Sequence, residues 1–375
     1  MAGEPNRPMK KVCIFGFPRM ENFHGYSIDS LDPSSYFPTV SRQMLFQKLS
    51  EAKSLDQMYR DKDPSYMRFV GDFVDKFRDA DLFVAYIYNP IHPEVLCKEL
   101  SQPIKVLGFI DDPFSTYVRG VPYLWAFDGA FYISPGYSDQ HLFQDALAQW
   151  GCEQSYWWPL VIPRANGTNE RDIWPLVAPR AEAQRRGDAF FRERDMDLIY
   201  VGAPYSSKMD RLAALKKRFG SRMRIHGRWP YAGYVGMLRS LRGKPAIWTR
   251  ITGISDAERT RLYYRTKIGI NVHLSDRPAE TGNMRMYEVP AHGMMLLCDK
   301  AGMSAHERIF APDKEAVFYD CTDDAIAKIE YYLRHDAERE SIARAGFARV
   351  HRDYDGETNM KSFLDWAISL PKKRP

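Results

Sequence analysis

The feature that most constrains this chain is an alternation of short apolar runs with helical segments. In its first half, runs rich in β-branched and aromatic residues alternate with segments whose apolar residues recur at helical spacing. The predicted strands are residues 11–17, 81–87, 104–110, 129–133 and 156–161, and the predicted helices are 42–52, 66–78 and 140–150. Such alternation indicates βαβ units, in which right-handed crossovers join parallel strands.

The same pattern restarts after an interruption. Residues 163–194 are crowded with Arg, Glu, Pro and Asn, which is typical of an exposed linker or insertion. Beyond them the predicted strands are 197–202, 223–227, 268–273 and 294–298, and the predicted helices are 208–219, 255–264, 285–292, 323–333 and an amphipathic ending at 341–368. Two α/β halves without a fixed repeat predict two Rossmann-like domains that face each other across a cleft.

The predicted domain boundaries follow these breaks. A length of 375 residues suits two domains. We expect an N-terminal Rossmann-like, acceptor-binding domain at residues 1–162, a linker or insertion at 163–196, and a C-terminal Rossmann-like domain that binds a nucleotide sugar at 197–355. A last helix within residues 356–375 is expected to pack back toward the N-terminal domain.

Composition excludes several classes of protein. Hydrophobic residues make up 45% and charged residues 27%, which is typical of a globular protein and not of a disordered one. The net charge of +5 suits an anionic ligand such as a nucleotide and neither indicates nor excludes a nucleic acid. The five cysteines form no C-x-x-C pair, so they indicate neither a disulfide framework nor a zinc site.

The expected location is the cytoplasm. The sequence has no apolar run near the roughly 20 residues of a membrane span, and its polar start lacks the hydrophobic stretch of a signal peptide. The basic tail of Lys372, Lys373 and Arg374 allows at most a weak peripheral contact with membranes.

The strongest motif is the stretch at residues 280–293, which reads ETGNMRMYEVPAHG. A carboxylate in the first turn of a helix accepts hydrogen bonds from the two hydroxyls of a ribose, and Glu288 suits that role. The unpaired N–H groups of the same helix start attract a pyrophosphate, and Arg285 offers it a fork of donors. Gly293 allows close packing where a side chain would block the next strand.

A second basic segment lies upstream. Gly202 ends a predicted strand, and a loop then leads to Lys208 and, one helical turn later, Arg211. A strand, glycine and loop that open a helix form an anion site when a basic side chain points back at it. Gly227 ends the next strand and is expected near the nucleotide base.

These motifs resemble a known family. The spacing of Glu280 and Glu288 resembles the E-x7-E region of retaining GT-B glycosyltransferases. The pattern N-x-R-x-x-E-x-x-A-x-G, from Asn283 to Gly293, resembles the CgeB-like (spore-maturation) branch, with a family-4-like C-terminal donor domain. The resemblance implies that a nucleotide-diphosphate sugar, most simply a UDP-sugar, is the co-substrate, without a cofactor or metal. It places Glu280 against hydroxyls of the donor sugar and Lys208 and Arg211 at the diphosphate.

The catalytic candidates of the first domain are less typical of that family. Asp111 and Asp112 directly follow a predicted strand, at the edge where α/β sheets bind ligands. Related retaining enzymes carry His-Asp there, so Asp111 stands in the place of that His. The pair is expected either to bind a sugar hydroxyl or to act as a base. His24, in the loop after the first strand, is expected on the acceptor side.

The predicted function is transfer of a sugar from a nucleotide-diphosphate sugar to an unknown acceptor, with retention of configuration. Asp195 and Asp197 form a D-x-D triplet, but it precedes its strand, so a metal-dependent GT-A enzyme is rejected. No hydrolase elbow or Walker loop is present. The alternatives are a nucleotide-sugar epimerase, a non-catalytic nucleotide-sugar-binding protein, and a transferase that modifies nucleic acid.

Overall fold

A computed structural model describes most of the chain as two compact units. The described residues are 9–15, 17, 19–41, 44–45, 48–49, 51–86, 89–109, 113–138, 141–159, 177–202, 206–227, 232–244, 246–247, 251–273, 282–300 and 302–373. Unit 1 comprises Met1–Ser134, His141–Pro159 and Glu357–Pro375, and unit 2 comprises Pro135–Gln140 and Leu160–Gly356.

Unit 1 is built on a seven-stranded sheet with the order β2-β3-β1-β4-β5-β6-β7. Its strands are β1 (Lys10–Ile14), β2 (Met20–Phe23), β3 (Tyr26–Asp29), β4 (Leu82–Ala85), β5 (Ile104–Phe109), β6 (Gly129–Tyr132) and β7 (Ser155–Trp157). Its helices are α2 (Ala52–Arg60), α3 (Pro64–Phe77), α4 (Pro93–Lys98), α5 (Pro113–Gly120), α6 (Phe143–Gln149) and α15 (Gly356–Ile368). Only β2 and β3 pair antiparallel among the described strands.

Local sequence explains how α3 and α15 join this sheet. Asp63 caps α3 by accepting a hydrogen bond from the backbone of Tyr66 at 2.9 Å, and a proline occupies the first helical position. The phenylalanines of α3 then face the sheet, with Phe73 edge-on to Phe83 at 5.6 Å between ring centres. In the C-terminal helix α15, the ring of Phe363 stacks on Trp158 at 4.2 Å, so Trp158 belongs to the core of unit 1.

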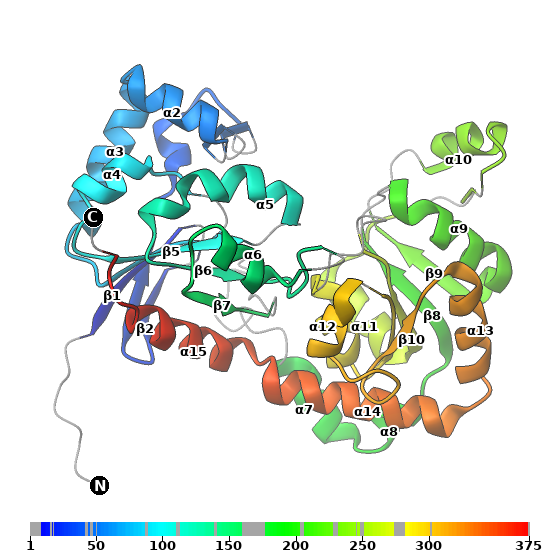
Figure 1. The fold of residues 1–375 in the computed structure, drawn as a ribbon. Coiled ribbons are helices and arrows are strands. Elements are labelled where there is room, and N and C mark those ends of the chain that lie inside the picture. Colours follow the sequence, from blue (N-terminus) through cyan, green and yellow to red (C-terminus); the bar gives the residue numbers. More distant parts are fainter. Residues whose placement is uncertain are drawn as a thin grey trace, which may run out of the picture. The chain divides into compact units, whose positions relative to one another are not determined.

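Unit 2 contains a five-stranded, fully parallel sheet with the order β12-β11-β10-β8-β9. Its strands are β8 (Met196–Val201), β9 (Met223–His226), β10 (Thr266–Asn271), β11 (Met295–Asp299) and β12 (Val317–Tyr319). Its helices are α7 (Val177–Arg186), α8 (Ala189–Arg192), α9 (Ser206–Phe219), α10 (Ala232–Leu241), α11 (Asp256–Arg265), α12 (Met284–Ala291), α13 (Thr322–Tyr332) and α14 (Asp336–Asp353). Helices α9 and α13 pack on one face, and α11, α12 and α14 cover the other (Figure 1).

The predicted strands of both halves are confirmed within a few residues, and the structure adds elements that the pattern did not predict. The additions are β2, β3, β12 and the helices α2, α4, α5, α7, α8 and α10. The region after β1, expected as a loop, contains the β2–β3 hairpin. His24 and Gly25 form its two-residue turn with φ of 49° and 87°, the backbone that tight hairpins require.

The parallel sheet of unit 2 has two distinct edges. We call the edge where the strands end the carboxyl edge, and the opposite one the amino edge. Helices α9 and α12 begin at the carboxyl edge, directly after β8 and beyond β10, so their N-terminal N–H groups gather there. Open α/β sheets bind ligands at this edge. None of the described helices is long and apolar enough to cross a lipid bilayer.

Candidate functional site

Arg285 is held at the carboxyl edge of unit 2 by three groups. Its Nε donates to the carbonyl oxygen of Val201 at 2.5 Å, and its Nη1 donates to Oδ1 of Asn271 at 2.9 Å. The guanidinium also lies over the ring of Tyr200, 4.6 Å from its centre. These contacts fix the cation across the ends of β8 and β10, so little conformational entropy is lost when an anion binds to it.

The start of α12 supplies further donors. Asn283 caps the helix by accepting a hydrogen bond from the backbone of Arg285 at 3.1 Å, and its buried Nδ2 has no hydrogen-bond partner among the described residues. Glu288 was expected in the first turn, but α12 begins at Met284, so Glu288 lies one turn further along and is half-buried. The ribose role therefore requires the carboxylate to reach its ligand from the second turn.

Two glycines have roles that the structure makes specific. A Cβ at Gly202 would lie 2.3 Å from Nη2 of Arg285, so only glycine leaves room for the guanidinium. Gly293 follows α12 with φ of 73°, and a Cβ there would lie 2.4 Å from the ring of Phe190 and 2.7 Å from Arg194. The close packing predicted for Gly293 is thus against α8 and Arg194. Gly227 directly follows β9.

The basic residues of α9 approach the same edge. Lys208 lies in the first turn of α9 and is buried. Arg211, one turn later, donates through Nη1 to Oδ2 of Asp299 at 2.7 Å. Asp299 is the last residue of β11, so this ion pair ties the start of α9 to the carboxyl edge.

A buried polar network connects Arg211 with Arg285. Nδ1 of His273 is hydrogen-bonded to Oδ1 of Asp299 at 2.7 Å, and the backbone N–H of His273 also donates to that carboxylate. Nδ2 of Asn271 donates to the sulfur of Cys298 at 3.3 Å, while its Oδ1 accepts from Arg285. Sγ of Cys298 in turn donates to Oδ1 of Asp299 at 3.7 Å, so the two arginines predicted from separate motifs belong to one hydrogen-bonded assembly.

The protonation states give this assembly an excess of positive charge. Burial lowers the pKa of His273, but the charge and hydrogen bond of Asp299 outweigh burial and raise it well above its ordinary value. Burial raises the pKa of Asp299, but His273 and Arg211 outweigh that effect and lower it. Burial raises the pKa of Cys298, which keeps the thiol neutral. The assembly therefore contains three cations, Arg211, Arg285 and protonated His273, and one carboxylate, Asp299. This excess of positive charge attracts an anion.

His273, Cys298 and Asp299 also form a possible metal-binding set, since their ligand atoms lie within 4.8 Å of one another. A metal would need about 2.0–2.3 Å to each atom. Instead, the ring nitrogen of His273 is bonded directly to the carboxylate, whose other oxygen accepts from Arg211. This geometry is that of a hydrogen-bonded network and does not fit a metal centre.

The sequence motifs missed Asn271, His273, Cys298 and Asp299. Each is a polar residue at, or directly after, the end of a buried strand, which is the available signal. Glu280, Asp111 and Asp112 lie outside the described residues. The D-x-D carboxylates lie at the amino edge, where Asp195 pairs with Arg265 and Asp197 with Arg222.

His24 is placed differently from the expectation. Its hairpin turn precedes β3, which runs parallel to β1, so the turn lies at the amino edge of the unit 1 sheet. Its Nε2 is 2.7 Å from Oε1 of Glu357 in α15. Ligands of α/β sheets bind at the opposite edge, so this position favours a structural role for His24 over an acceptor-binding one.

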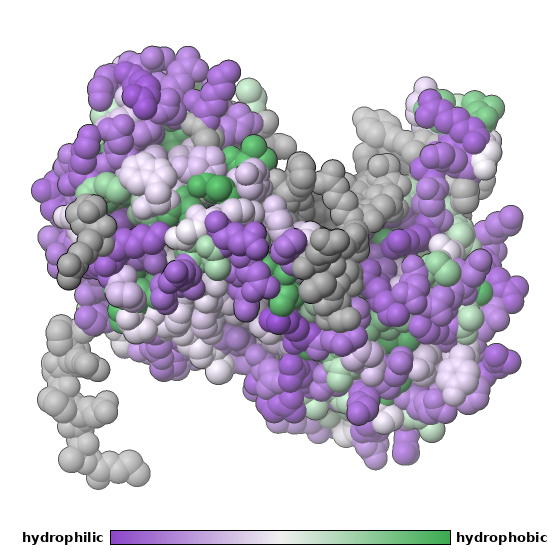
Figure 2. All heavy atoms as spheres, in the orientation of Figure 1, coloured by the Kyte–Doolittle hydropathy of each residue, from purple (hydrophilic) through white to green (hydrophobic). Residues whose placement is uncertain are grey.

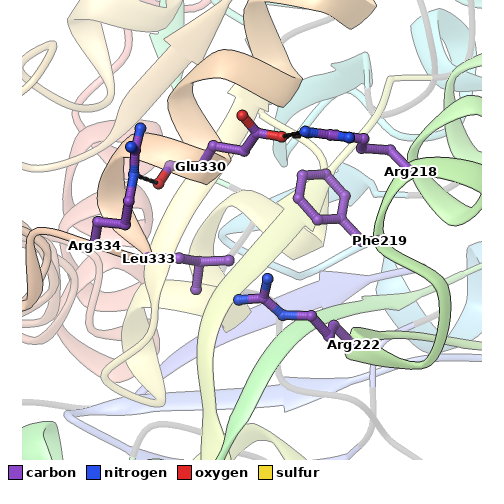
Figure 3. Close-up of a pocket in the computed structure, with 6 residues that line it drawn as sticks. All are labelled: Arg218, Phe219, Arg222, Glu330, Leu333 and Arg334. Carbon is purple, nitrogen blue, oxygen red and sulfur yellow. Dashed lines mark hydrogen bonds and ion pairs between the residues drawn. The ribbon is translucent and has the colours of Figure 1, made fainter.

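A cavity of about 420 Å³ lies at the amino edge of unit 2 (Figure 3). It is lined by Arg218, Phe219, Arg222, Glu330, Leu333 and Arg334. Arg218 pairs with Glu330, and Nε of Arg334 donates to the carbonyl oxygen of the same residue at 3.0 Å. Arg222 pairs with Asp197 at 2.6 Å. Two of the three arginines are thus neutralised by carboxylates, so the cavity is a poorer anion site than the carboxyl edge.

Comparison with known proteins relates the second half of the chain to a described family. Residues 209–365, which include Arg211, the whole buried network and α12, match the family described as glycosyl transferase-like. This part of the chain is therefore similar to a glycosyltransferase domain. The enzyme class predicted from the sequence is thereby confirmed. No protein of curated function matches the sequence.

Solved structures show the same fold over nearly the whole chain. HepE of Anabaena, in complex with UDP and glucose, has a TM-score of 0.57 at 12% identity, covering 96% of this chain and 100% of its own. An alpha-glucosyltransferase in complex with UDP-glucose and DNA containing an abasic site has a TM-score of 0.58 at 11% identity. The match covers 95% of this chain and 99% of that one. Sucrose-phosphate synthase from Thermosynechococcus elongatus has a TM-score of 0.57 at 14% identity, and the match covers 94% of this chain and 87% of that one. The predicted GT-B fold with two Rossmann-like domains is confirmed.

Proposed function

We propose that unit 2 binds a nucleotide-diphosphate sugar, most simply a UDP-sugar, at its carboxyl edge and that the chain transfers the sugar to an acceptor bound by unit 1. The observation that carries this proposal is the network joining Arg285 to Arg211 through Asn271, Cys298 and Asp299. It presents fixed positive charge beside the starts of two helices, which is what a diphosphate requires.

In this proposal each residue of the site contacts one part of the donor. Arg285, Lys208 and Arg211 face the diphosphate, Glu288 accepts hydrogen bonds from the ribose, and Gly227 lies near the base. The leaving diphosphate is neutralised by these cations and the α12 start, without a metal. Glu280 contacts the sugar. UDP and glucose or UDP-glucose are present in two of the similar structures, which supports this class of donor.

We further propose that the transfer retains the anomeric configuration and that the chain belongs to the CgeB-like branch. The E-x7-E spacing of Glu280 and Glu288 supports retention of configuration, and the pattern from Asn283 to Gly293 supports the CgeB-like branch with a family-4-like donor domain. Asp111 and Asp112 are proposed to contact acceptor or sugar hydroxyls. Five free cysteines support a reducing, cytoplasmic setting.

A thermal-shift screen of UDP-, GDP-, TDP- and ADP-sugars tests the site. At a ligand concentration of about 100 times Kd, binding adds about 2.7 kcal/mol to the free energy of unfolding, which raises the melting temperature measurably. We expect one nucleotide class to do so for wild type and for the control Glu330→Ala, whose glutamate pairs with Arg218 at the amino edge. Glu288→Ala is expected to respond less. An equal response of Glu288→Ala, or none by wild type, contradicts the site.

Product analysis separates transfer from the other activities on this fold. Incubation with donor alone yields an epimer if the chain is a nucleotide-sugar epimerase, whereas a transferase gives only slow hydrolysis to free sugar and nucleotide. Binding without turnover in an acceptor screen indicates a non-catalytic protein. For a transferase, proton NMR of the product reads the anomeric configuration and tests retention.

A further inference from the structure

Helix α10 turns its apolar side chains toward the solvent. Four of them are at least 40% exposed: Tyr234 at 63%, Met237 at 44%, Leu238 at 40% and Leu241 at 78%. They recur at i, i+3, i+4 and i+7, so they form one stripe along the helix, which we call the α10 stripe. In Figure 2, hydrophobic atoms cover part of this helix, beside hydrophilic ones. A surface helix of a globular protein normally turns such a stripe to the core.

Contacts on the other side of α10 hold the stripe outward. Gly236 is buried, and a Cβ there would lie 2.9 Å from the carbonyl oxygen of Ile247, so the backbone packs closely on this side. Arg239, whose side chain is mostly buried, pairs with Asp210 of α9. The small and polar side of the helix therefore contacts the protein, and the apolar side is presented for another partner.

The sequence segment that contains α10 is one-sided in charge. Residues 211–255 contain eleven of the 53 Lys and Arg residues and none of the 48 Asp and Glu residues. The other 330 residues thus have 42 basic and 48 acidic residues, a formal charge of −6, although the whole chain has +5. The positive charge of the protein is concentrated in the segment that contains α10, which indicates an anionic partner.

Two cations that directly follow the α10 stripe have no acidic partner among the described residues. Several others in the segment pair with acids, as Arg211 does with Asp299 and Arg218 with Glu330. Arg242 and Lys244, directly after α10, are exposed, and neither forms an ion pair with a described residue. An apolar stripe that ends in two solvent-exposed cations matches the layered chemistry of a lipid surface, with acyl chains beneath phosphates.

We propose that α10 docks the protein on an anionic membrane surface, with the α10 stripe at the level of the acyl chains and Arg242 and Lys244 against lipid phosphates. The aliphatic Met237, Leu238 and Leu241 favour lipid over nucleic acid, whose bases stack on aromatic side chains. Binding of this kind combines a modest apolar area with charge attraction and is reversible. It is independent of the proposed donor site.

Co-sedimentation of the full chain with vesicles tests the proposal. We expect binding to phosphatidylcholine vesicles with about 30 mol% phosphatidylglycerol and little binding to phosphatidylcholine alone. The double variant Leu238→Glu/Leu241→Glu is expected to lose binding to the anionic vesicles and to show none to phosphatidylcholine alone. Arg242→Gln/Lys244→Gln is expected to weaken binding to the anionic vesicles by about twenty-five-fold, since each cation contributes about fivefold.

Matched controls separate docking from misfolding. Val118→Glu changes an equally exposed apolar residue of unit 1, and Lys98→Gln/Lys300→Gln removes two exposed cations elsewhere. All variants are expected to melt like wild type, and both controls to bind like it. Absence of vesicle binding by wild type, or binding unaffected by Leu238→Glu/Leu241→Glu, overturns the proposal. So does a dimer, or a complex with single-stranded DNA, that these substitutions abolish while vesicle binding persists.

Discussion

The two edges of the unit 2 sheet use arginine in opposite ways. At the amino edge Arg218, Arg222 and Arg265 are each more than 40% exposed and pair with Glu330, Asp197 and Asp195. At the carboxyl edge Arg211 and Arg285 are held in a buried network around the single carboxylate of Asp299. Solvated pairs are weak and interchangeable, whereas buried charges act at short range and in fixed positions. The same residue type thus provides solubility at one edge and a ligand site at the other.

The largest expected difference between the edges is the loss of free energy of unfolding when a carboxylate is removed. Asp299→Asn leaves Arg211 and His273 without their buried counter-charge, so it should lower the free energy of unfolding by about 3–5 kcal/mol. Asp195→Asn removes the partner of Arg265 at an exposed position, so it should have no measurable effect. Urea unfolding of both variants measures this. Equal costs would show that the two edges do not differ in the way described.

Buried histidines sharpen the comparison through opposite pKa shifts. Asp299 raises the pKa of His273, so its contribution to stability is complete below the ordinary pKa and is lost as pH rises through the raised one. His292, at the end of α12, has no such partner. Burial lowers its pKa from 6.5 to about 4, so the unfolded chain binds a proton that the native chain rejects, and stability falls by about 3 kcal/mol from pH 6.5 to 4.

A pH series of unfolding curves tests the His292 contribution. His292→Gln should reduce the loss of stability on the acid side. His335→Gln is the matched control, because His335 is exposed and its Nδ1 also donates to the carbonyl four residues earlier, as Nδ1 of His292 does. If the acid-side loss is the same in both variants and in wild type, His292 is not protonated on unfolding as described.

A smaller effect is expected from crowding Arg285. Gly202→Ala places a methyl group 2.3 Å from the present position of Nη2, so the guanidinium must move, and UDP should bind about tenfold more weakly, which is about 1.4 kcal/mol. Gly71→Ala is the control, since a Cβ there meets nothing within 4 Å and the position is helical. Its UDP affinity should equal that of wild type. Unchanged affinity of Gly202→Ala would remove Arg285 from the donor site.

The sequence could predict most of the fold because the hydrophobic pattern is local. Residues 198–201 of β8 and 295–298 of β11 are continuous apolar runs, so their residues identify these strands directly. Strand β12 has only three residues, and the β2–β3 hairpin carries polar residues on an edge, so neither produced a clear period. Helix α10 has a helical period, but its stripe faces solvent, which a pattern alone does not reveal.

The candidate site was only partly predictable because its contacts are not local. Arg285 and Arg211 were found from motifs, as parts of helix starts. Their connection depends on the register of β10 against β11, which brings His273 and Asn271 beside Asp299 although 26 or more residues separate them in sequence. Isolated polar residues at strand ends carry no spacing signal, so the network emerges only when the strands are paired.

Isothermal titration of UDP into Arg211→Gln and Arg222→Gln tests the central claim most directly. Arg211 lies in α9 at the carboxyl edge, and Arg222 follows the end of α9 at the amino edge. Each of them pairs with an aspartate. Because Arg211→Gln loses a charge-assisted hydrogen bond to the ligand, we expect it to bind UDP about tenfold or more weakly than wild type. We expect Arg222→Gln to bind UDP with unchanged affinity. Equal affinities in the two variants, or a loss confined to Arg222→Gln, would contradict a donor site at the carboxyl edge.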